Sequence, residues 1–548
     1  DLVVHLEHGV GRYLGLEKPD TSGLAAEYLV LEYANNDKIF VPVTSLFMIS
    51  RYNGQDSQHV SLHRLGSSVW EKAKRKAAEK IHDVAAELLA LHAKREATPG
   101  QAFAIEEHDY QRFRSAFPFE ETPDQMNAIE AVRDDMMAAK SMDRLVCGDV
   151  GFGKTEIAMQ AAFIAAMNGQ QVSVLVPTTL LAQQHYQSFC DRFADWPVSI
   201  GIVSRLQTPK EQKATLEKLA LGQVDIIIGT HKLLQPTIRF KALGLIIVDE
   251  EHRFGVRQKE KIQAMRAEVD LLTLTATPIP RTLNMALSGT RDLSIIATPP
   301  AKRLAIKTFL QRFSPAMIQE AMQRELLRGG QLYFLHNDVA SMETMKEQLL
   351  TIVPQARIAI AHGQMSEKQL ERVMADFYHQ KFNVLLSTTI IESGIDVPTA
   401  NTILINKADR FGLAQLHQIR GRVGRSHHQA YAYLLVDEPT AISSDAQKRF
   451  DALLSQDDLG AGFYLATHDL EIRGAGELLG EGQSGHMQVI GFTLYMDMLE
   501  EAVEAIKGGK PFNSQPKQSH QASVECGIAA LLPDTYIHDV NTRLSLYQ

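Results

Sequence analysis

One short motif restricts the fold of this chain more than any other feature. Residues 148–155 read G-D-V-G-F-G-K-T and fit the phosphate-binding pattern G-x-x-x-x-G-K-[ST]. The apolar run 145–147 before it predicts a buried strand, and 157–167 after it has the spacing of a helix. Strand, glycine loop and helix are the context in which backbone amides and a helix N-terminus hold phosphate.

The motif assigns roles to its last two residues. Lys154 is predicted to reach the β- and γ-phosphates of ATP, and the Thr155 hydroxyl is predicted to hold Mg²⁺. The residues predicted to surround the nucleotide here are Gly148, Asp149, Val150, Gly151, Phe152, Gly153, Lys154 and Thr155.

Length and composition fit a multidomain protein of a reducing compartment, and we expect a cytoplasmic location. The chain has 548 residues, and no apolar run approaches the roughly 18 residues of a membrane helix. Its three cysteines lie far apart, which fits neither a disulfide framework nor a zinc site. The net charge of −9 leaves nucleic-acid binding open, because that needs only a local basic surface. The chain begins without Met, so we expect a fragment of a longer protein.

The N-terminal part looks different from the rest. Residues 1–66 contain short strand patterns joined by turn signals, which predict a small β-barrel. We interpret it as a binding module, with a merely structural cap as the alternative. Residues 67–100 hold one long helix, expected over 70–94, whose first turns are rich in Lys and Arg. That basic run fits a solvated face, a contact with DNA or a docking surface equally well.

Two further regions alternate strand and helix. Apolar runs such as 172–177 and 243–248 in region 101–300, and 331–335 in region 301–455, are strands buried on both faces. This pattern predicts two α/β domains with parallel sheets. Only the first has a phosphate loop, so a cleft between the two domains is the expected ligand site.

The remaining chemistry lies at strand ends and on one helix. Asp249 and Glu250 end a very apolar strand, where Asp249 is predicted to hold Mg²⁺ and Glu250 to deprotonate the attacking water. Gln418, Arg422 and Arg425 lie in a segment interpreted as helical. Arg422 and Arg425 would then share a helix face and act as arginine fingers on the γ-phosphate.

These motifs together resemble those of the superfamily 2 helicases and translocases, which have two RecA-like domains. Residues 148–155 resemble motif I, 249–252 motif II in its DEEH form, 177–179 motif Ia, 275–277 motif III, 387–398 motif V and 418–425 motif VI. The resemblance implies adenine recognition by Phe119 and Gln125, and nucleotide contacts from Gly394 and Asp396. It also implies contacts with the nucleic-acid backbone from Thr178, Thr179, Thr230, Thr388 and Thr389.

Residues 456–520 restrict the resemblance to two families within this superfamily. The segment L-E-I-R-G-A-G-E-L-L-G at 470–480 is similar to the translocation motif shared by RecG helicases and transcription-repair coupling factors. This motif is a helical hairpin that moves on duplex DNA, with Arg473 at the position of its central arginine.

The N-terminal module favours the coupling factors. The segments 5–13 and 40–43 resemble the CarD-like, Tudor-type module that in this family binds the β subunit of bacterial RNA polymerase. The family's UvrA-recruiting N-terminal region and its C-terminal domain are not recognised here, apart from a linker at 521–548. UvrA is therefore an expected partner of the full-length protein only.

The sequence thus predicts an Mg²⁺- and ATP-dependent translocase on double-stranded DNA that binds stalled RNA polymerase, displaces it and couples transcription to excision repair. The main alternative is a RecG-like enzyme that remodels branched DNA. An adaptor with a nucleotide switch fits less well, because pure binding does not need Glu250, Arg422 and Arg425 together. An RNA helicase is a further alternative, against which the translocation motif argues.

Overall fold

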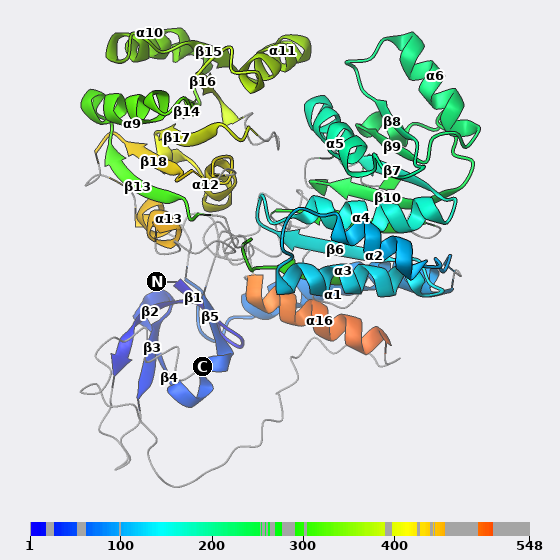
Figure 1. Cartoon of the computed structure of the whole chain (residues 1–548). Coiled ribbons are helices and arrows are strands. Elements are labelled where there is room, and N and C mark those ends of the chain that lie inside the picture. Colours follow the sequence, from blue (N-terminus) through cyan, green and yellow to red (C-terminus); the bar gives the residue numbers. More distant parts are fainter. Residues whose placement is uncertain are drawn as a thin grey trace. The chain divides into compact units, whose positions relative to one another are not determined.

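The structure is a computed structural model (Figure 1) in which the described residues form two compact units. The first unit contains the described parts of 1–92 and 468–548, and the second contains those of 93–279 and 291–467. The described residues are 2–17, 27–51, 62–97, 100–251, 254, 258, 261–262, 269–276, 291–300, 304–389, 397–424, 428–438, 442, 444–454 and 492–507.

The first unit begins with an antiparallel sheet of five strands in the order β4-β3-β2-β1-β5. Its strands are β1 (Leu2–His5), β2 (Gly9–Glu17), β3 (Tyr28–Glu32), β4 (Lys38–Pro42) and β5 (Ile49–Arg51). The 3-10 helices η1 (Ala34–Asn36) and η2 (Val43–Met48) flank β4. The predicted short strands and tight turns are confirmed. No pairing between β4 and β5 occurs among the described residues, so closure into a barrel stays a prediction.

Two helices pack on this sheet and share one core with it. They are α1 (Val69–Ala97), close to the helix predicted over 70–94, and α16 (Phe492–Lys507). Trp70 of α1 is buried and donates its indole N–H to the Leu6 carbonyl at 3.1 Å. The core joins side chains from both ends of the sequence: Val4, Val10, Trp70, Ala77, Ala78, Ile81, Ala85, Leu494, Tyr495, Met498, Leu499, Ala502 and Val503.

The second unit contains two parallel sheets, as the alternating pattern predicts. The first has the order β12-β6-β11-β10-β7-β9-β8. Its strands are β6 (Asp143–Gly148), β7 (Gln171–Leu175), β8 (Ile200–Val203), β9 (Ile226–Gly229), β10 (Leu243–Asp249), β11 (Asp270–Thr275) and β12 (Asp292–Ile296). The helices around it are α2 (Glu107–Ser115), α3 (Pro123–Met137), α4 (Lys154–Met167), α5 (Thr179–Arg192) and α6 (Pro209–Ala220). Helix α4 lies against the central strands β6, β7, β10 and β11, which explains why nearly all of its residues are buried.

The second sheet has the order β13-β18-β17-β14-β16-β15. Its strands are β13 (Lys307–Arg312), β14 (Gln331–Leu335), β15 (Ile358–Ala361), β16 (Val384–Ser387), β17 (Ala400–Asn406) and β18 (Tyr431–Val436). The helices of this domain are α9 (Pro315–Leu327), α10 (Met342–Ile352), α11 (Glu367–Tyr378), α12 (Leu413–Arg420) and α13 (Ser444–Leu454). The short helices η3 (His231–Leu234), η5 (Val339–Ser341) and η7 (Ala408–Arg410) follow strand ends.

Both sheets place the carboxyl ends of their parallel strands along one edge, which is where such folds bind ligands. None of the described helices has the length and apolarity that a membrane span requires. The predicted hairpin falls largely outside the described residues, since only α16 of 456–520 is described. The predicted domain boundaries therefore remain predictions.

Candidate nucleotide site and nucleic-acid contacts

The phosphate loop connects β6 to α4 in a conformation that its glycines permit. Gly151 and Gly153 have φ values of 83° and 75°, a region that residues with a side chain rarely adopt. Gly153 is the N-cap of α4, so the loop amides gather at a helix N-terminus. Phe152 is fully buried in the core beneath and anchors the loop.

Gln125 holds the loop from the neighbouring helix. It forms a capping box with Thr122 at the start of α3, which fixes one end of its amide. The other end, Nε2, donates to the Phe152 carbonyl at 2.8 Å. Gly153 has a left-handed φ, and a Cβ there would lie 2.4 Å from the same nitrogen, so this position favours glycine. Phe119, the other predicted adenine contact, is 66% exposed, and adenine recognition by either residue stays a prediction.

Lys154 is buried at the base of the loop. Its Nζ donates to the carbonyls of Gly148 and Asp149, at 2.5 and 2.9 Å. Burial lowers the pKa of Lys154, and the carboxylates of Glu250 and Asp249 oppose that shift. Lys154, the loop and the acidic motif (residues 249–251) therefore form one electrostatic site.

Asp249 and Glu250 lie at the carboxyl end of β10. This strand belongs to the same sheet as β6, which leads into the phosphate loop. Asp249 Oδ2 is 2.9 Å from His185 Nε2 on α5. Burial raises the pKa of Asp249, but the hydrogen bond from His185 and the charge of Lys154 lower it below its ordinary value. Asp249 is therefore ionised at neutral pH, as a magnesium ligand must be.

Glu250 has an unusual backbone. Its φ is 55°, its side chain is buried, and its N–H donates to the Leu274 carbonyl at 3.0 Å. Left-handed backbone at a residue other than glycine costs of the order of 1–3 kcal/mol and often marks a functional position. The strain supports the predicted role of Glu250.

The residues present fit Mg²⁺ and ATP. The Thr155 hydroxyl and the Asp249 carboxylate are oxygen donors, which Mg²⁺ prefers, and the loop supplies amides for phosphate. Among the described residues, no group of three or more His, Cys, Asp or Glu side chains forms a metal site.

The motif VI segment needs one correction. Helix α12 ends at Arg420, so Arg422 lies beyond it, and the expected helix face shared by Arg422 and Arg425 is wrong. Gly421 is the C-cap of α12, and Gly424 has a φ of 78°, which lies outside the helical region, so the backbone before Arg425 is not helical. Arg422 is 2% exposed, and Gln418 is half-buried on the last turn of α12.

The second unit brings this segment to the phosphate loop. A small cavity is lined by Asp149, Val150, Ala276, Ile306, His417, Gln418, Arg420 and Gly421. His417 Nε2 lies 3.7 Å from Asp149 Oδ2. The predicted nucleotide residues Gly394, Asp396 and Arg425 lie outside the described residues, as do His252 and Thr277.

The threonines predicted to contact nucleic acid all follow strands at carboxyl ends. Thr178 and Thr179 follow β7, Thr230 follows β9, and Thr388 and Thr389 follow β16. Thr178 caps α5, and the Thr179 hydroxyl donates to the Glu371 carboxylate. Thr230 and Thr388 are buried, whereas the other three are partly exposed. Arg473, the remaining predicted contact, lies outside the described residues.

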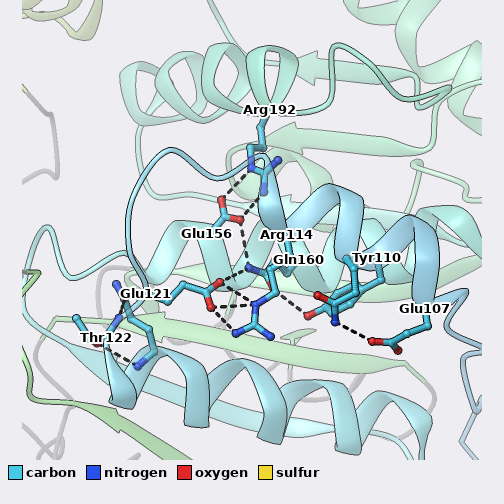
Figure 2. A network of polar contacts seen from close by, with 10 residues as sticks. Glu107, Tyr110, Arg114, Glu121, Thr122, Glu156, Gln160 and Arg192 are labelled. Atoms are coloured by element: carbon cyan, nitrogen blue, oxygen red, sulfur yellow. Dashed lines mark hydrogen bonds and ion pairs between the residues drawn. The ribbon is translucent and has the colours of Figure 1, made fainter.

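A polar network that includes Glu156 and Gln160 of α4 was not predicted from the sequence (Figure 2). Arg192, the last residue of α5, binds both carboxylate oxygens of Glu156 at 2.7 and 3.1 Å. Gln160 donates to Glu156 and to Glu121, each at 3.2 Å, and Glu121 pairs with Arg114 on α2. The network therefore ties α2 and α5 to the helix that starts at the phosphate loop.

Three family models match the chain. The DEAD/DEAH box helicase model matches residues 122–286, the helicase conserved C-terminal domain model 315–427, and the CarD-like/TRCF RID domain model 1–53. A solved structure titled "Structure of RecG bound to three-way DNA junction" is 28% identical, with a TM-score of 0.67 over 89% of this chain and 77% of that chain. The chain is a helicase-type protein with two RecA-like domains and a CarD-like module.

Curated relatives narrow this class to one family. The transcription-repair-coupling factor of Escherichia coli is 63% identical over 546 residues, which are 100% of this chain and 48% of the relative. That of Buchnera aphidicola subsp. Baizongia pistaciae is 52% identical over 551 residues, which are 78% of the relative. The chain belongs to the transcription-repair-coupling factor family. It spans about half the length of the Escherichia coli relative.

Proposed function

We propose that this chain is the motor and polymerase-binding core of an ATP-driven translocase on double-stranded DNA. In the bacterial cytoplasm it would bind stalled RNA polymerase and displace it, coupling transcription to nucleotide excision repair. The observation that carries the proposal is that one chain combines a complete phosphate loop and acidic motif with a CarD-like module. A nucleotide switch alone would need only the phosphate loop and the acidic motif. A structural module alone would need only the CarD-like fold.

The chemistry follows from the site. Bound Mg²⁺ would neutralise charge on the β- and γ-phosphates. Lys154 would leave the loop carbonyls and bind those phosphates, while Thr155 and Asp249 supply oxygen ligands. Glu250 would orient the attacking water and accept its proton. Gln418, Arg422 and Arg425 would complete the site at the γ-phosphate.

The N-terminal sheet supplies a surface for the polymerase. Leu14 on β2 and Phe40 on β4 are 46% and 45% exposed, although both are large and apolar. Exposed apolar side chains on a small module are candidates for protein contacts. We infer that these two residues contribute to the interface with the β subunit. UvrA binding would require parts of the full-length protein outside this chain.

The RecG-like alternative has one observation in its favour. The matching RecG structure covers most of this chain and is described as bound to a three-way DNA junction. A fork remodeller would hydrolyse ATP faster on branched DNA than on linear duplex. A polymerase-displacing translocase needs no branch.

ATP hydrolysis on linear and forked duplexes tests the proposal. Linear duplex should stimulate ATP hydrolysis by the wild-type chain. Lys154→Ala and Glu250→Gln should each reduce the hydrolysis rate about 100-fold or more. Glu250→Gln removes a general base, which contributes 10²–10⁴-fold, and Lys154→Ala removes the cation expected at the β- and γ-phosphates. Gln187→Ala, on an exposed part of α5, is the control with unchanged turnover. Wild-type rates in either site variant would contradict the site assignment. Stimulation by forks only would favour the RecG-like alternative.

A further inference from the structure

Helix α5 links the predicted nucleic-acid contacts to the nucleotide site. It begins after its N-cap Thr178, whose hydroxyl accepts from the Leu181 N–H at 3.3 Å. It ends 14 residues later at Arg192, about 21 Å away at 1.5 Å per residue. Along this length its side chains contact both chain segments that are proposed to hold Mg²⁺-ATP.

The first contact is between His185 and Asp249. The imidazole is buried and its Nε2 lies 2.9 Å from Asp249 Oδ2. With the proton on Nε2 the ring donates to the carboxylate, a tautomer that we assign from this geometry. The other ring nitrogen, Nδ1, is buried and has no hydrogen-bond partner among the described residues. In the part of the chain that the structure describes, the ring makes its polar contact with Asp249, and it packs near Phe189.

The second contact fixes the C-terminal end of α5 to α4. Arg192 binds both carboxylate oxygens of Glu156, the residue directly after Thr155 (Figure 2). Its guanidinium also donates to the Phe113 carbonyl at 2.7 Å and stacks 3.9 Å above the Phe113 ring. A bidentate pair of this kind resists rotation, because two parallel hydrogen bonds define its geometry.

These contacts determine how a movement of α5 would affect the site. Arg192 holds the C-terminal end of α5 at Glu156. A shift of the N-terminal end, at Thr178 and Thr179, would therefore change the position of His185 relative to Asp249. A hydrogen-bonding partner behind a metal ligand fixes the orientation of that ligand, and its loss typically costs 10–100-fold in metal affinity or activity.

We propose that His185 is a positioning residue for Asp249, and that α5 carries the effect of nucleic-acid binding at Thr178 and Thr179 to this metal-holding carboxylate. The proposal rests on the proposed function for the identity of the two ligands. It assigns to His185 a role in magnesium use that none of the sequence motifs identifies.

The test compares three variants of the full chain. His185→Ala removes the donor, His185→Gln keeps a donor of similar reach, and Gln187→Ala is the control on the same helix. Gln187 is exposed and its amide donates to Asp191, one turn further along α5, at 2.9 Å. The first measurement is the Mg²⁺ concentration at which a fluorescent ADP analogue (mant-ADP) is half bound. The second is the stimulation of ATP hydrolysis by linear duplex.

For His185→Ala we expect the half-saturating Mg²⁺ concentration to rise about 10-fold, within the range for partners of metal ligands. Stimulation by duplex should be lost, while binding of the duplex itself remains. His185→Gln should restore both values to within about 3-fold of wild type, and Gln187→Ala should match wild type. Such rescue is not expected if His185 only fills space.

Two outcomes would overturn the proposal. One is a wild-type Mg²⁺ requirement in His185→Ala, and the other is a defect in His185→Gln as large as that of the alanine variant. Failure of the proposed function shows differently, because the wild-type chain itself would then lack stimulation by duplex. In that case the Mg²⁺ dependence of mant-ADP binding, which needs neither DNA nor hydrolysis, still decides the role of His185.

Discussion

At the scale of single residues, burial sets the protonation of several groups outside the nucleotide site. His5 on β1 is 4% exposed, and its Nδ1 accepts from the Glu7 N–H at 3.2 Å. Burial, with the nearby His8 ring, lowers the pKa of His5 to about 4. Burial lowers the pKa of His63 in the same unit as well. Both rings are therefore neutral in the folded protein at neutral pH.

This gives a pH prediction for the first unit. The unfolded chain protonates His5 near pH 6.5, whereas the folded unit resists protonation down to about pH 4. The contribution of His5 to stability is thus complete above pH 6.5 and is lost as the pH falls from 6.5 to 4. Discounted for solvent screening, we expect a loss of about 1 kcal/mol at pH 5, or roughly 2–4 °C in the melting temperature.

Trp70 fluorescence measures this effect, because Trp70 lies in the core of the first unit. A Trp196→Phe background removes the only other tryptophan. His5→Asn keeps an acceptor for the Glu7 N–H but does not titrate. Between pH 7.5 and 5 the melting temperature should fall less in His5→Asn than in the parent. Equal falls would contradict the assignment, and the contribution of His63 should persist in both proteins.

At the scale of elements, a buried ion cluster holds the acidic motif to the sheet. The side chain of Arg291 is fully buried, 2.9 Å from Asp143 and 3.2 Å from Glu251. It also donates to the Thr273 hydroxyl at 2.6 Å. One cation therefore connects the start of β6, the middle of β11 and the residue after Glu250.

Removal of this cation should be costly. Arg291→Met takes the cation away from two buried carboxylates, and breaking such a pair costs about 3–5 kcal/mol. Urea denaturation followed by circular dichroism should show a loss of that size for the second unit. The matched control is Arg133→Met, whose pair with the exposed Glu107 is worth about 1 kcal/mol or less. A similar small loss in both variants would contradict the structural role of Arg291.

The elements also show how far sequence reasoning reaches. The phosphate loop, its strand and its helix were predictable, because each requirement is local: φ above zero at Gly151 and Gly153, and buried apolar runs. The end of α12 at Arg420 was missed, although Gly421 and Gly424 are a helix-stop signal.

Other parts of the site leave no local signal. His185 and Asp249 are 64 residues apart, and a single histidine on an amphipathic helix looks like an ordinary core residue. Arg291 is separated from Asp143 by more than a hundred residues, and its burial is unexpected for arginine. Partners of this kind depend on the order of the strands, which the sequence pattern does not specify.

At the scale of the whole molecule, the first unit shares its core among the N-terminal sheet, α1 and α16. Deleting residues 1–66 would expose that core, since Val4 and Val10 belong to the same cluster as Trp70 and the buried residues of α16. A deletion would therefore confuse loss of polymerase binding with loss of folding. Substitution of an exposed apolar residue, such as Phe40, separates the two effects.

Release of a transcript from stalled RNA polymerase tests the central claim most directly. The polymerase is stalled on linear duplex by withholding a nucleotide, and wild-type chain and ATP are added. We predict ATP-dependent release that is absent with Lys154→Ala and reduced several-fold with Phe40→Ser, although Phe40→Ser keeps its duplex-stimulated hydrolysis. Leu327→Ser, at an 87% exposed apolar residue of the second unit, should act as wild type. No release by a wild-type chain that hydrolyses ATP on linear duplex would contradict the account.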